Sequence, residues 1–331
     1  ARTFGSYALQ LFDISDTRIL VPGLGIALLI FAFVVNLSAN KLIEGLASLL
    51  GMVKIGGIIV FGLVGIAVAD KTEVMSSSNH LEGGLLGFLG ATALGILAFK
   101  GFTTITNSGS ELKNPHRNVG RSIVISILLC IFIYGLVGFA VFSNLSLEEI
   151  IKTRDYSLAA AARPAMGDYG LWFTVILAMV ATAGGIIASV FAVSRMLAML
   201  TEMNLVPHSH FGMPGSIQKH TLVYTIVLGL LLTAFFDLSR IAALGVIFYL
   251  VMDIAIHWGV LRHLHSELGA RRDIVVIATV LDLAILTGFV LVKIVSDPLV
   301  IGVACIAMAA ILIAEVIFLH RNPITSEQHD H

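Results

Sequence analysis

The chain has 331 residues, of which 57% are hydrophobic and only 12% are charged, and its formal net charge is −1. Soluble domains carry roughly 25% charged residues, so the composition excludes an ordinary soluble enzyme or binding module. A nucleic-acid-binding protein is also excluded, because it would need a basic stripe. The composition therefore predicts an all-α polytopic membrane protein in a lipid bilayer.

Nine apolar stretches approach the length of about twenty residues that a membrane-spanning helix needs. They are residues 20–37, 45–69, 85–107, 122–143, 171–200, 222–236, 241–261, 273–295 and 298–319. The stretch 222–236 is short and needs flanking residues to span. The connectors Asp70–Glu82 and Asn144–Asp168 are polar, and we expect a short surface helix in the second. These stretches predict a single transmembrane domain over residues 1–331, without a soluble domain.

Lysines and arginines are more frequent in one set of alternate loops than in the other. The richer set contains Lys41, Lys113, Arg117, Arg121, Lys219, Arg262, Arg271, Arg272 and Arg321. Because positive loops face the cytoplasm, we expect the C-terminus there, with residues 321–331 as a disordered tail. We expect an integral protein of a prokaryotic inner or plasma membrane.

Residues 95–121 read GILAFKGFTTITNSGSELKNPHRNVGR and combine an apolar helix with polar residues at membrane depth. Glycines and hydroxyl side chains weaken a helix there. An interrupted membrane helix is tolerated where it is buried in protein or lines a water-filled cavity. Broken helices form the midplane substrate sites of secondary transporters, where free N–H groups meet anionic groups. A kinked structural helix, with its threonines bonded to its own carbonyls, is the alternative interpretation.

This stretch resembles the sixth helix and following loop of the amino acid–polyamine–organocation (APC) transporters, through A-F-x-G-F and E-L-K-N-P-x-R-N. The segments 36–41 with 49–54, and 189–195 with 204–207, are similar to other passages of the same family. The resemblance implies a LeuT-type five-plus-five inverted-repeat fold, of which this chain supplies helices 4 to 12. We then expect the end of helix 3 to helix 5 in 1–69, helices 6–10 in 84–261, and helices 11–12 in 273–320. Helices 1, 2 and most of 3 would be missing.

The resemblance assigns substrate binding to the broken sixth helix. The expected substrate-binding residues are Leu97, Ala98, Phe99, Lys100, Gly101, Phe102 and Thr103. Lys100 departs from the family, which usually has an apolar residue at this position. Thr103 departs from several cation-handling members, which carry a carboxylate there. An amino acid that is neutral or acidic is therefore favoured over a cationic one. Alternatively, Lys100 pairs structurally with Asp253 of the tenth helix.

Lys54 lies in the middle of an apolar run, and an ionisable residue there is a functional candidate. The resemblance implies that it carries the coupling proton, at the place that sodium occupies in sodium-coupled relatives. A lysine removed from water gives up its proton more readily. Ser189 is a candidate hydroxyl partner. The alternative is a lysine that snorkels to the membrane surface.

Asp253 and His257 lie four residues apart, hence on one helix face. They form either a protonatable pair beside the pathway or a structural hydrogen-bonded pair. Asp282 and Lys293 are interpreted as structural or interfacial. The loop residues Glu111, Lys113, Asn114, Pro115 and Arg117 are expected to form the cytoplasmic gate or fix the topology.

The sequence thus predicts a proton-coupled secondary active transporter of amino acids that works by alternating access. The alternatives are an exchanger without proton coupling, or a truncated, inactive transporter fragment. The sequence contains no catalytic motif of a membrane enzyme, such as H-E-x-x-H or G-x-S-x-G, and no filter segment of a channel. No cofactor is expected, and His208 and His210 lack a second pair of ligands for a metal. The particular amino acid and the oligomeric state are left open.

Overall fold

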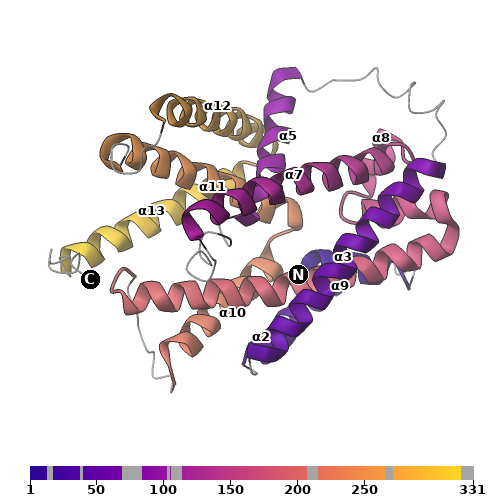
Figure 1. Cartoon of the computed structure of the whole chain (residues 1–331), viewed down its shortest axis with the longest axis horizontal. Coiled ribbons are helices and arrows are strands. Elements are labelled where there is room, and N and C mark those ends of the chain that lie inside the picture. The colour runs from indigo at the N-terminus through magenta and orange to yellow at the C-terminus, as the bar shows by residue number, and fades with distance from the viewer. Residues whose placement is uncertain are drawn as a thin grey trace. The chain divides into compact units, whose positions relative to one another are not determined.

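In the computed structural model, every regular element of the described residues is helical (Figure 1). The described residues are 1–12, 18–37, 40–68, 84–102, 105, 114–206, 215–264 and 271–321. The helices are α1 (Arg2–Leu9), α2 (Leu20–Asn36), α3 (Asn40–Val68), α5 (Gly84–Phe99), α7 (Pro115–Phe142), α8 (Leu147–Lys152), α9 (Ser157–Glu202), α10 (Ile217–Phe235), α11 (Leu238–Gly259), α12 (Arg272–Ser296) and α13 (Pro298–Arg321). A 3₁₀ turn, η2 (Lys100–Phe102), follows α5, and a π turn, η4 (Val260–Leu264), follows α11.

Seven of these helices are long and apolar enough to cross a bilayer, and α2 and α5 are shorter apolar helices. Each of the nine apolar stretches of the sequence therefore forms a helix. Many large apolar side chains on them are exposed, which is the pattern of a surface that faces lipid instead of water. The all-α polytopic class is confirmed.

Some helices extend beyond the apolar stretches of the sequence, and one ends before its stretch does. The stretch 171–200 lies inside α9, which begins at Ser157 because the Ala-rich segment that follows this residue has high helix propensity. This helix turns at Gly167, whose φ of 64° is in the region that favours glycine. The stretch 85–107 leaves the α conformation after Phe99, inside the segment 95–121 where the sequence predicts an interruption. The short surface helix expected between residues 144 and 168 is α8, and a capping box of Ser146 and Glu149 begins it.

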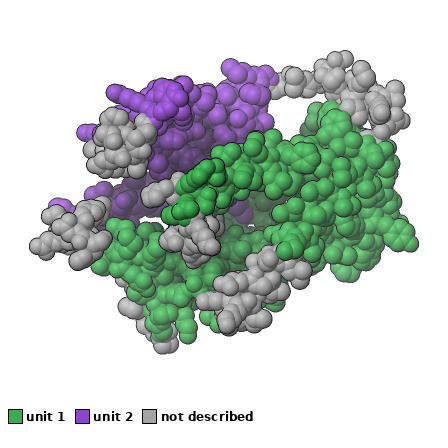
Figure 2. Space-filling model, in the orientation of Figure 1, with its two compact units in different colours: residues 1–80, 102–238 green, residues 81–101, 239–331 purple. Residues whose placement is uncertain are grey.

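The chain divides into two compact units (Figure 2). Unit 1 contains residues 1–80 and 102–238, and unit 2 contains residues 81–101 and 239–331. In unit 1, α3 packs against α7 and α9, and α9 also packs against α10, α2 and α1. Glycines allow the close approach of α3: a methyl group added at Gly57 would lie 2.5 Å from Leu177 Cδ1, and one at Gly62 would lie 2.6 Å from Leu136 Cγ.

In unit 2, α12 packs against α5 and α13. A methyl group added at Gly288 of α12 would lie 2.6 Å from Leu89 Cδ1 of α5, so the two helices approach closely at this glycine. At the start of α11, Arg240 Nε donates a hydrogen bond to Asp297 Oδ2 at 2.7 Å. The contact with α12 holds α5 within unit 2.

Candidate functional site

The α-helical conformation of α5 ends where the sequence predicts an interruption. Lys100 to Phe102 form a 3₁₀ turn, in which side chains eclipse and hydrogen bonds are poorer than in an α-helix. Ala98 and Gly101 are exposed, whereas Leu97 and Phe99 are half-buried. Leu97 lies against α11, since a methyl group added at Gly245 would be 3.3 Å from Leu97 Cδ1. Thr103 and the side chain of Phe102 lie outside the described residues.

Lys100 pairs with Asp253 of α11, as the structural alternative for Lys100 predicted. Its ammonium group donates a hydrogen bond to Asp253 Oδ2, and the two side chains are only 8% and 19% exposed. The same ammonium lies 5.7 Å from the centre of the Tyr249 ring, within the range of a cation–π contact. A charge this well buried is tolerated because it is paired. The ion pair therefore ties the turn after α5 to α11.

Asp253 and His257 each pair with a residue of another element instead of with each other. His257 Nδ1 lies 3.2 Å from Asp282 Oδ2 of α12, while Asp253 is engaged by Lys100. Of the two interpretations of the Asp253–His257 spacing, neither anticipated this arrangement. Asp282 was predicted only as structural, because the sequence carries no signal for which face of α12 meets α11.

Lys54 is half-buried in α3, and Ser189 is exposed on α9. Gly57, one turn after Lys54, contacts Leu177, and Ser189 lies about 18 Å further along α9 at 1.5 Å per residue. A direct contact between Lys54 and Ser189 is not among the contacts of the described part of the chain. Their pairing stays a prediction.

The expected cytoplasmic loop is described only from Asn114 onward, so Glu111 and Lys113 lie outside the described residues. Asn114 has a φ of 51° and precedes α7, whose first residue is Pro115. Proline is favoured at the first helical position, because its ring fixes a helical φ and the missing N–H would have no partner there. Asn114, Pro115 and Arg117 are exposed. The role of this loop as a gate stays a prediction.

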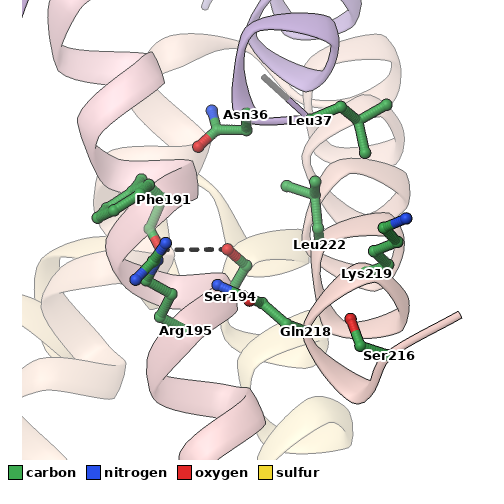
Figure 3. Close-up of a pocket in the computed structure, with 9 residues that line it drawn as sticks. All are labelled: Asn36, Leu37, Phe191, Ser194, Arg195, Ser216, Gln218, Lys219 and Leu222. Carbon is green, nitrogen blue, oxygen red and sulfur yellow. Dashed lines mark hydrogen bonds between the residues drawn. The ribbon is translucent and has the colours of Figure 1, made fainter. Parts of the chain in front are cut away.

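Unit 1 contains a polar cavity of about 180 Å³ that the sequence did not predict (Figure 3). It is lined by Asn36, Leu37, Phe191, Ser194, Arg195, Ser216, Gln218, Lys219 and Leu222. Ser194 Oγ donates to the carbonyl of Phe191 at 3.1 Å, and the Arg195 guanidinium lies 4.1 Å from the Phe191 ring centre. The lining carries two cations and no carboxylate, so it suits an anionic or polar group. The sequence feature that could have indicated this cavity is the Ser-Arg pair at 194–195. It lies at the end of a segment that supports only the family resemblance in the sequence.

Among the described residues, no group of three or more His, Cys, Asp or Glu side chains is arranged to hold a metal ion. The loop that contains His208 and His210 lies outside the described residues. The described chemistry consists instead of an interrupted apolar helix with a buried ion pair, within a bundle of membrane-spanning helices. This combination defines a polytopic membrane protein with a discontinuous helix.

A family model described as "Amino acid permease" matches residues 1–327. The chain therefore belongs to the amino acid permease family, and the resemblance of the sequence to APC transporters is confirmed.

Three relatives illustrate the range of the family. The protein MJ0609 of Methanocaldococcus jannaschii is 24% identical over 96% of this chain and 72% of its own length. The inner membrane transport protein YbaT of Escherichia coli is 25% identical over 88% of this chain and 67% of its own length. The high-affinity methionine permease of Saccharomyces cerevisiae is 24% identical over 57% of this chain and 34% of its own length.

Proposed function

We propose that this chain is a secondary active transporter of amino acids that works by alternating access, with its substrate at the interruption after α5. The observation that carries the proposal is the change from α5 to the 3₁₀ turn Lys100–Phe102 in a member of the amino acid permease family. Where an α-helix is interrupted, backbone N–H and C=O groups lose their intrahelical partners. These groups bind the carboxylate and ammonium that all amino acids share.

The substrate is a neutral or acidic amino acid. Lys100 brings a positive charge to the interruption, and Asp253 is already engaged by that charge. A cationic side chain at this position would approach the ammonium group of Lys100, and like charges that close disfavour binding. This argument concerns the side chain of the substrate, since its α-carboxylate and α-ammonium are common to every candidate.

Transport is coupled to protons through Lys54. Its place is half-buried on an apolar helix, and an ionisable residue inside a membrane span is a functional candidate. A lysine that gains and loses a proton once in each cycle would carry that proton across with the substrate. An exchanger without proton coupling is the alternative function, and the pH dependence of uptake separates the two.

The substrate class is tested with the purified chain in detergent and in proteoliposomes. We expect a thermal-shift screen of the twenty amino acids to select neutral or acidic ones, and the selected ones to accumulate in proteoliposomes. Gly101→Val should abolish uptake, because it adds bulk at the interruption, whereas Gly95→Val, six residues earlier in α5, should retain it. An added Cβ meets no atom within 4 Å at either glycine, so the two variants are matched in their immediate surroundings. Equal uptake by both variants, or selection of lysine or arginine, would contradict the proposal.

Proton coupling is tested with two substitutions of Lys54. Lys54→Ala should abolish uptake driven by a pH gradient. Lys54→Arg keeps the charge but does not release its proton near neutral pH, so it should retain exchange of substrate across the membrane while losing the response to the gradient. Unchanged proton dependence in both variants would end the assignment of Lys54.

A further inference from the structure

Four ionisable side chains form one cluster inside unit 2. Lys100 pairs with Asp253, and His257 Nδ1 lies 3.2 Å from Asp282 Oδ2. His257 follows Asp253 by one turn of α11, and Asp282 lies within electrostatic range of both Asp253 and Lys100. The side chains of His257 and Asp282 are 29% and 15% exposed. Three different elements, η2, α11 and α12, therefore contribute charges to one place.

The facing atoms of His257 and Asp282 require a shared proton. Both atoms are inaccessible to solvent, and neither has a hydrogen-bond partner elsewhere in the described residues. Two bare acceptors would repel each other at 3.2 Å, so a proton must lie between the imidazole nitrogen and the carboxylate. With that proton on Nδ1, the imidazole is still neutral, and the second nitrogen, Nε2, can accept a further proton. His257 is thus oriented by Asp282 and retains one basic site.

The formal charge of the cluster depends on that second proton. Lys100 is positive and the two aspartates are negative, so the four side chains carry a net charge of −1 when His257 is neutral. They carry none when His257 is an imidazolium. In the first state a single ammonium serves two carboxylates, and in the second each carboxylate has a cation. At low dielectric such a difference in pairing is large compared with the same change in water.

Other titratable groups on the surrounding elements do not remove this imbalance. Between Gly84 and Phe99, α5 carries none. Tyr249 of α11 contacts Lys100 through its ring. Arg240 of α11 pairs with Asp297. The remaining charged or titratable residues of the packed elements are Arg272, Asp273 and Lys293 of α12, Arg262 and His263 of η4, and Cys305, Glu315, His320 and Arg321 of α13, of which Cys305 is exposed. Asp273 pairs with Arg271, Lys293 lies over Phe289, and Arg262, Glu315 and His320 are exposed. The side chains of His263 and Arg321 lie outside the described residues.

We propose that His257 and Asp282 form a proton-binding site, and that its occupancy controls how firmly Lys100 holds Asp253. Proton uptake at Nε2 of His257 gives Asp282 its own cation and leaves Lys100 to Asp253 alone. Loss of that proton makes Asp282 compete with Asp253 for Lys100. Lys100 begins the turn that interrupts the helix. The protonation of His257 therefore affects the interruption through the Lys100–Asp253 ion pair. This site is distinct from Lys54, which lies in unit 1.

Proton binding is tested on the purified chain in detergent by ¹⁵N-histidine NMR, which does not depend on transport. Imidazole charges between about pH 5 and 8, so spectra are recorded across that range. The signals of His257 and of the exposed His320 are identified by their loss in His257→Gln and His320→Gln. We expect the His257 signal to titrate, and Asp282→Asn to displace its midpoint while leaving that of His320 in place. The proposed proton-binding site is overturned if the His257 signal does not titrate, or if Asp282→Asn leaves the midpoint of its titration unchanged.

The link to transport rests on the proposed function, and a separate measurement tests it. In proteoliposomes, the ratio of the uptake rates at the two ends of the range between about pH 5 and 8 should be at least tenfold smaller in His257→Gln than in the unaltered chain. His320→Gln should keep the ratio of the unaltered chain. An unchanged pH profile in His257→Gln overturns the control of Lys100 by this site. If no amino acid is taken up by the unaltered chain, the proposed function fails, while the NMR titration still decides whether the proton site exists. Asp282→Asn provides the same test should His257→Gln not fold.

Discussion

The charge count of the cluster makes an asymmetric prediction for Lys100 and Asp253. Lys100→Met leaves two carboxylates, Asp253 and Asp282, with only His257 to offset them. Removing one partner of a buried ion pair costs about 3–5 kcal/mol, and the 8% and 19% exposure of the pair places Lys100→Met in that range. Asp253→Asn leaves Lys100 within range of Asp282, so the remaining charges balance and we expect a loss below about 2 kcal/mol.

The decisive variant is the double one. Lys100→Met with Asp253→Asn removes both members of the pair and leaves His257 with Asp282. It should therefore be more stable than Lys100→Met alone by about 2 kcal/mol, which is roughly a thirtyfold difference in the unfolding equilibrium. Such a rescue is an interaction energy between two sites in contact.

The assay is equilibrium unfolding of the purified protein in mixed micelles with increasing SDS. Helix content is followed by circular dichroism, and the region of the cluster by the fluorescence of Trp258, which is adjacent to His257 in the sequence. Equal stabilities of Lys100→Met and the double variant, or a cost of Lys100→Met below 1 kcal/mol, would refute the reasoning.

Three further outcomes follow from described contacts. Gly288→Val should destabilise unit 2 by about 1–3 kcal/mol, measured by thermal unfolding in detergent, because its Cβ would lie 2.6 Å from Leu89 Cδ1. Thr221→Val should cost about 1 kcal/mol in the same assay, because Thr221 Oγ1 is buried and donates a hydrogen bond to the Ser194 carbonyl at 2.7 Å, which joins α10 to α9. Hydrogen bonds from Ser146 lower the pKa of Glu149 below its ordinary value of 4.5. The hydrogen-exchange protection of α8 should therefore be full above that value and should fall as the pH drops through the lowered pKa.

Each of these has a matched control. Gly302→Val should be neutral, since Gly302 of α13 has open space around it. Thr225→Val removes a hydroxyl that bonds only within α10 among the described hydrogen bonds, so it should cost less than Thr221→Val. Glu149→Gln keeps the capping interaction without a titrating group, and the protection of α8 should then be independent of acid pH. If a control variant changes stability or the pH dependence of protection as much as the variant it is matched with, the contact assigned to that variant does not have the expected effect.

The sequence determined the class of the protein and the place of each membrane helix. Within the described residues each of the nine apolar stretches contains a helix, because a helix satisfies its backbone polar groups internally where no water is available. The interruption near Lys100 was also predictable, since glycine and threonine weaken a helix locally. The motif from Glu111 to Asn118 identified the family. All of these are properties of short, contiguous segments.

Only the tertiary structure decided which ionisable side chains meet. The spacing of Asp253 and His257 put them on one helix face, but each found its partner on a different element. The sequence could not select Asp282 for His257, because helix periodicity fixes the face of a residue relative to its own helix and not the rotation of a neighbouring helix. That rotation follows from packing, here from the close contact of Gly288 with Leu89 between α12 and α5. The proton site proposed for this transporter is therefore a product of helix packing, built from residues that the sequence offers only singly.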